Sequence, residues 1–178
     1  MKKEFDIEDQ WVSFELHPET PLDGILLADR FPGADIEGMM AHLNHTGAPF
    51  GIRFGELKRL SNSRLALQAG EFARDQGAFH QFHDLLFKAY FTDIRDIGRI
   101  EVLLDEAGQA GLDAGALKTA LEDGTYLSRL EEAGREARRQ EVKAIPALFF
   151  NNGTVGHRIV GAQPFQVFQN TLKTMSQT

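Results

Sequence analysis

The spacing of apolar residues predicts a helical middle flanked by shorter extended regions. Residues 11–16 alternate, with Val12, Phe14 and Leu16 on one face, which is typical of a strand packed against a core. Farther along, apolar residues recur every three or four positions, as on the buried face of a helix. We therefore expect helices over about residues 35–45, 61–76, 79–90, 96–108, 113–124 and 126–140. We expect a loop over 22–33, and an irregular or briefly extended stretch over 48–55.

The end of the chain has a different pattern. A proline, Pro146, opens the apolar run 147–150 and cannot donate a ladder hydrogen bond, so we expect a strand start, a sheet edge or a cis peptide. The turn signal at 151–153 and the run 158–161 predict a returning strand, and 164–175 a final helix. The order indicates an α/β protein with a helical insertion. We expect residues 1–55 and 141–178 to form the sheet portion and 56–140 the inserted subdomain.

Composition narrows the classes of function. The chain has 178 residues, a net charge of −7 and no cysteine. An acidic chain is a poor partner for nucleic acids or anionic membranes, and no apolar run reaches the roughly 18 residues of a membrane span. Without cysteine the sequence has no disulfide, no thiolate–metal site and no thiol nucleophile. We expect a cytoplasmic protein without a metal or cofactor.

Several short motifs occur in the order seen in a known family. They are Phe14–Pro18, Asn62–Ala66, Phe82–Phe91, Leu121–Gly124, and Ile145-Pro146 followed by Val160–Pro164. With them the chain resembles DsbA-family proteins, specifically the FrnE-like branch that includes 2-hydroxychromene-2-carboxylate isomerases. The resemblance implies a thioredoxin-like fold with a helical insertion, a cis proline at Pro146, and a family activity of thiol–disulfide oxidoreductase or glutathione-dependent isomerase.

The start of the chain departs from this family. There, a first strand leads into a Cys-x-x-Cys motif, or a Ser variant, at the start of a helix, but only ten residues precede Trp11. The chain therefore resembles the family without its first strand and active-site motif, as expected for a mis-assigned start, a truncated chain or a decayed paralogue. If so, the natural protein is longer, or the residues before Trp11 or a segment of a partner chain fill the gap, which would give a homodimer.

Three residues are candidates for ligand binding, and none is a candidate for catalysis. The resemblance implies that the backbone of Ile145, before Pro146, pairs with a peptide or a glutathione-like thiol. His17 ends the strand expected over residues 11–16, which the resemblance places beside the family's active site. Its alternative role is that of a polar residue capping the end of that strand. The histidine pairs 42/45 and 80/83 lack further ligands and indicate surface positions rather than a metal site. Two hypotheses stay open: an enzyme of the DsbA family, or a non-catalytic interaction protein.

Overall fold

The computed structural model describes residues 4–177, which divide into two compact units. Residues 13–132 form the helical unit, and the residues before 13 together with those from 133 onward form the hairpin unit. This division differs from the expected domain boundaries at 55 and 141. Residues 13–55 belong with the helices because their polar groups bond to them: Asn62 Nδ2 donates to Thr20 O at 2.7 Å, and Gly55 N donates to Phe91 O at 2.8 Å.

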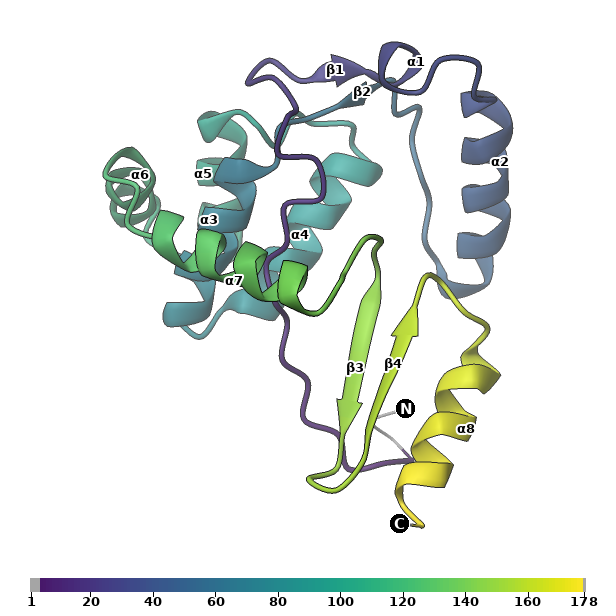
Figure 1. Cartoon of the computed structure of the whole chain (residues 1–178). Helices are drawn as coiled ribbons and strands as arrows, with labels where there is room; N and C mark the ends of the chain where they lie inside the picture. The colour runs from purple at the N-terminus through teal and green to yellow at the C-terminus, as the bar shows by residue number, and fades with distance from the viewer. Residues whose placement is uncertain (1–3, 178) are drawn as a thin grey trace. The chain divides into compact units, whose positions relative to one another are not determined.

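The helical unit contains most of the regular structure (Figure 1). Its elements are β1 (Ile25–Leu26), α1 (Leu27–Arg30), α2 (Ile36–Gly47), a 3-10 turn η1 (Ala48–Phe50), β2 (Arg59–Leu60), α3 (Arg64–Asp75), α4 (Phe79–Phe91), α5 (Ile100–Gln109), α6 (Ala114–Glu122) and the first part of α7 (Leu127–Arg139). Aspartates cap α2 and α6 at their N-termini: Asp35 accepts from Gly38 N at 2.8 Å, and Asp113 accepts from Ala116 N at 3.0 Å.

The core of the helical unit lies among α3, α4, α5 and α6. Phe82, Leu103 and Leu117 are its largest fully buried side chains. Phe72 on α3 meets the ring of Tyr126 edge-on, with the ring centroids 6.3 Å apart. The apolar face expected for residues 79–90 therefore packs into this core, with Phe82 and Tyr90 as its buried members.

Two expectations for the N-terminal part were wrong. Residues 11–16 form no strand in the described chain, because no neighbouring strand pairs with them. Their polar side chains contact α3 instead: Ser13 Oγ donates to Glu71 at 2.6 Å, and Glu15 pairs with Arg64 at 3.4 Å. The stretch 22–33, expected to be a loop, contains β1 and α1; β1 pairs antiparallel with β2 through Ile25 and Leu60.

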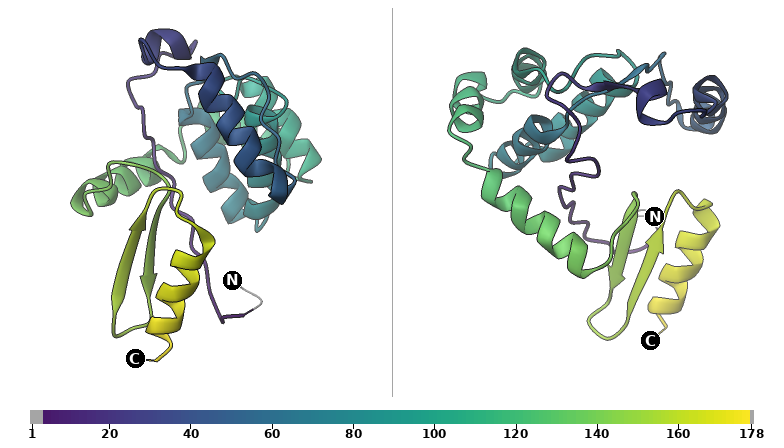
Figure 2. Two further views of the ribbon diagram at one scale, coloured as in Figure 1. Left: turned by 90° about the vertical axis from the view of Figure 1, so that its right-hand side faces the viewer. Right: turned by 45° about the horizontal axis from the view of Figure 1, so that its top comes forward.

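The hairpin unit contains β3 (Ala147–Asn151), β4 (Gly156–Val160) and α8 (Phe165–Met175). The antiparallel pairing of the two strands and the final helix confirm the sequence prediction. Figure 2 shows α8 lying along the hairpin. Phe150 and Phe168 bring the two together, with ring centroids 6.5 Å apart, and Ile159 is buried. Within residues 4–177, no helix combines the length and the apolar character needed to cross a bilayer.

Candidate functional site

The start of β3 presents an exposed apolar residue with free backbone groups. Pairing with β4 begins at Ala147, and Pro146 O accepts a hydrogen bond from Gly161 N at 2.8 Å. Ile145, joined to Pro146 by a cis peptide bond, is 52% exposed. Among the described residues, no backbone group bonds to the N–H or C=O of Ile145. Both groups are therefore available to an extended ligand.

His17 belongs to the helical unit, whereas Ile145 and Pro146 belong to the hairpin unit. Its Nδ1 lies 3.2 Å from Nη2 of Arg30 and 3.4 Å from Oε1 of Glu19, and its ring meets Phe31 edge-on. Arg30 also donates to Glu19 at 2.9 Å. A hydrogen bond from its own backbone lowers the pKa of the Glu19 carboxyl below its ordinary value of 4.5, and Arg30 and His17 lower it further. The ring of His17 is thus engaged in a local ion-pair group.

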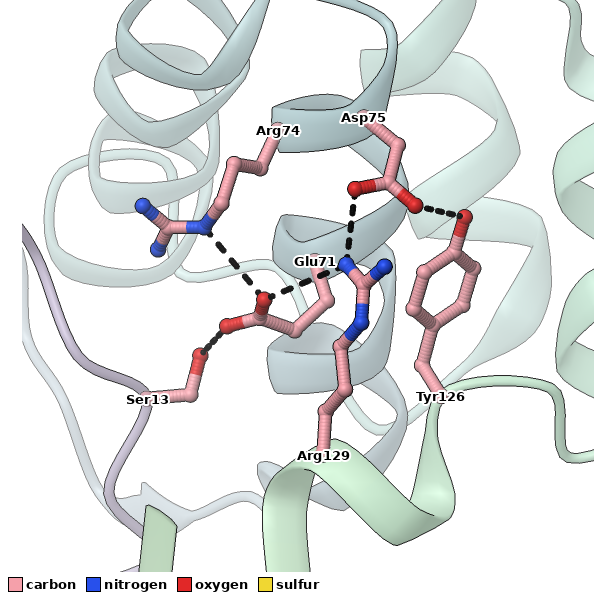
Figure 3. Close-up of polar contacts among 6 residues, drawn as sticks. All are labelled: Ser13, Glu71, Arg74, Asp75, Tyr126 and Arg129. Carbon is pink, nitrogen blue, oxygen red and sulfur yellow. Dashed lines mark hydrogen bonds and ion pairs between the residues drawn. The ribbon is translucent and has the colours of Figure 1, made fainter. Parts of the chain in front are cut away.

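A polar cluster in the helical unit was not anticipated from the sequence (Figure 3). This Glu71 cluster consists of Ser13, Glu71, Arg74, Asp75, Tyr126 and Arg129. Glu71 is buried; it accepts from Ser13 Oγ at 2.6 Å and from Arg74 Nε at 3.3 Å. Arg129 lies 3.9 Å from Glu71 and donates to Asp75 at 2.7 Å. The cluster thereby ties residue 13 and the start of α7 to α3.

The charges in the cluster shift the proton affinities of its members. The hydrogen bond from Arg129 lowers the pKa of the Asp75 carboxyl below its ordinary value of 3.8, and the bond from Tyr126 Oη, at 3.1 Å, acts in the same direction. Burial, followed by the bond to Asp75, raises the pKa of Tyr126 above 10.0. Because the members satisfy one another's hydrogen-bonding groups, the cluster stabilises the fold.

The histidine pairs show no metal-binding arrangement. His80, His42 and His45 are exposed, and His83 lies between two rings, 5.6 Å from Phe79 and 4.2 Å from Phe87 by ring centroids. Over the described part of the chain, no group of three or more His, Asp or Glu side chains is placed to hold an ion.

Comparisons with known proteins match this architecture. The family model described as a DSBA-like thioredoxin domain matches residues 1–173. The chain is 28% identical over 172 residues to the uncharacterized protein YwbO of Bacillus subtilis (strain 168), covering 94% of this chain and 82% of that protein.

Two crystal structures share the fold. The probable DsbA oxidoreductase SCO1869 from Streptomyces coelicolor has a TM-score of 0.83 at 22% identity, over 92% of this chain and 73% of that one. A putative protein disulfide isomerase from Nitrosomonas europaea has a TM-score of 0.70 at 14% identity, over 89% and 78%. The architecture is thus a DsbA-like thioredoxin fold, α/β with many helices. The chain belongs to the DSBA-like thioredoxin domain family.

Proposed function

We propose that this chain is a non-catalytic member of its family that binds an extended peptide at the start of β3. The observation that carries the proposal is Ile145, whose side chain is exposed and whose backbone groups bond to no described backbone group. A peptide lying beside it would gain main-chain hydrogen bonds, and the side chain of Ile145 would add apolar contact.

The similar proteins support a polypeptide as the ligand. The Streptomyces protein is named a probable DsbA oxidoreductase and the Nitrosomonas protein a putative protein disulfide isomerase. A protein that rearranges disulfides in other proteins must hold a segment of polypeptide. Placement in the FrnE-like branch is part of the same proposal and is supported by the ordered motifs of the sequence.

Thiol chemistry is a separate matter from binding. Thiol–disulfide exchange proceeds by attack of a thiolate, and this sequence contains no cysteine. The proposed site therefore holds a peptide without exchanging bonds with it. The proposed site consists of Ile145 and Pro146. His17 is not part of it, because its ring is engaged by Arg30 and Glu19.

The test is a binding measurement with two substitutions at one position. The probe is a fluorescein-labelled insulin B chain whose cysteines are carboxymethylated, followed by fluorescence anisotropy. Ile145→Ala keeps the backbone N–H, whereas Ile145→Pro removes it. We expect Ile145→Pro to bind roughly tenfold more weakly than Ile145→Ala, the effect of losing about 1.4 kcal/mol.

Circular dichroism on each variant shows whether the hairpin unit keeps its fold. Reduced glutathione, added in excess, tests whether a small thiol peptide competes for the same place. Equal binding by the folded Ile145→Pro and Ile145→Ala variants, or no binding by the unmodified chain, would overturn the proposal.

A further inference from the structure

Charge is distributed unevenly along this acidic chain. Residues 133–178 carry six basic side chains and two acidic ones, a net charge of +4. Because the whole chain carries −7, residues 1–132 carry −11. The basic side chains are Arg135, Arg138, Arg139, Lys143, Arg158 and Lys173. This part of the hairpin unit is therefore suited to an acidic partner.

One face of the β3–β4 sheet is open. Leu148, Phe150 and Ile159 lie on the face that packs toward α8, and Phe149 lies on the other face, which we call the open face. Phe149 is 51% exposed and stands directly opposite Arg158 in the pairing. A shallow groove of about 340 Å³ is lined by Phe149 and Arg158 from the open face, by Phe150 and His157 from the other face, and by Gln140.

The arginine in this groove is held in place. Its Nη1 donates to the backbone carbonyl of Gln140, just after α7, at 2.8 Å. Arg158 therefore shares the open face with the exposed Phe149, which lies opposite it on the neighbouring strand. A face that combines an arginine with an exposed aromatic residue fits a segment that carries both carboxylates and large apolar side chains.

Residues 6–12 combine carboxylates with large apolar side chains. The segment contains Asp6, Glu8 and Asp9 and ends with Trp11 and Val12, both of which are exposed. It forms no helix or strand in the described chain. Seven extended residues span about 23 Å, whereas a five-residue strand such as β3 spans roughly 17 Å. The segment is therefore long enough to lie along the whole of β3.

We propose that the open face of one copy binds residues 6–12 of a second copy, giving a symmetric homodimer by reciprocal exchange. Charge complementarity favours this occupant, because the segment is acidic and the face belongs to the basic part of the chain. In its own copy the chain just before the segment is directed to α8, since Gln169 on α8 donates to Glu4 at 3.0 Å. α8 covers the other face of the sheet, which leaves the open face to a partner copy.

Sedimentation velocity of the full chain over a range of concentrations tests the proposal. At low salt we expect a monomer–dimer equilibrium that weakens as salt is raised, because the contact pairs opposite charges. Arg158→Glu and Glu8→Lys should each weaken the dimer by roughly tenfold or more. The chain that carries both reversals should dimerise again, which a loss of folding could not produce.

A pair of phenylalanine variants tests the apolar contact. Phe149→Ser should weaken the dimer, whereas Phe50→Ser, at an exposed position of the helical unit, should not. The proposal is overturned by a chain that stays monomeric at every concentration at low salt, by a dimer that Arg158→Glu leaves unchanged, or by open-ended oligomers larger than a dimer. Ile145→Pro leaves this contact intact, so the dimer and the peptide site are tested separately.

Discussion

Replacing Glu71 with alanine should destabilise the helical unit by about 2 to 3 kcal/mol. Its carboxylate accepts a 2.6 Å hydrogen bond from Ser13, and a bond to a charged group contributes roughly 1.5 kcal/mol or more. Arg74 and Arg129 are 31% and 48% exposed, so solvent screens them and each ion pair contributes about 0.5 kcal/mol.

The assay is urea unfolding followed by far-UV circular dichroism, which reports mainly the helices. Glu101→Ala is the matched control, because Glu101 is an exposed glutamate on α5; it should change the unfolding free energy by about 0.5 kcal/mol or less. The two glutamates differ in burial and in their contacts, so the difference between the variants isolates the cluster.

A double-mutant cycle tests the contact between Ser13 and Glu71 directly. Ser13→Ala should cost about 1.5 kcal/mol in the unmodified chain and close to nothing beside Glu71→Ala, so that the coupling is about 1.5 kcal/mol. Fully additive costs, or a Glu71→Ala variant as stable as the Glu101→Ala control, would refute the role given to the cluster.

Three further predictions concern the core, the pH dependence and the chemistry. Phe82→Ala should cost about 3 to 5 kcal/mol because its ring is fully buried, whereas Phe87→Ala on the exposed side of the same helix should cost far less; equal unfolding midpoints would contradict this. Because the pKa of Asp75 is lowered in the folded state, its stabilisation is complete above about pH 4 and is lost as the pH falls through the folded-state value. The stability gap between the unmodified chain and Asp75→Asn, measured by urea unfolding at several pH values, should therefore shrink on acidification, and a gap that widens would be inconsistent with the shift. The purified chain should not accelerate insulin reduction by dithiothreitol, and turnover above the uncatalysed rate would show thiol chemistry that the sequence does not provide.

Much of the helical architecture could be predicted because its signals are local. The caps Asp35 and Asp113 lie within three residues of the amides they bond, and apolar spacing marks the buried faces. The hairpin could also be predicted from local sequence, since Asn151 and Asn152 accept hydrogen bonds from the amides of the turn that follows them.

The predictions that were wrong or absent concern features that depend on contacts between residues far apart in the sequence. Residues 11–16 alternate like a strand, but alternation supplies no pairing partner, and Ser13 bonds to α3 instead. The contact of Ser13 with Glu71 joins positions 58 residues apart, and Arg129 reaches Asp75 across 54 residues. No local pattern reveals such contacts. β1 has only two residues, too few for any periodicity to show.

The same limit applies to the candidate site. Pro146 and the strand after it could be recognised from the sequence, because a proline has few places in a sheet. The free backbone groups of Ile145 became visible only with the pairing register, which begins at Ala147. The open face likewise depends on which residues α8 covers.

The central claim, that this chain binds a peptide at the start of β3, is tested most directly by nuclear magnetic resonance. The carboxymethylated insulin B chain would be titrated into the isotope-labelled chain and backbone amide shifts followed. The largest shifts are predicted at Ile145, whose backbone groups are unpaired, and at Ala147, the first paired residue of β3. No shift at saturating peptide, or shifts confined to the helical unit, would contradict the account.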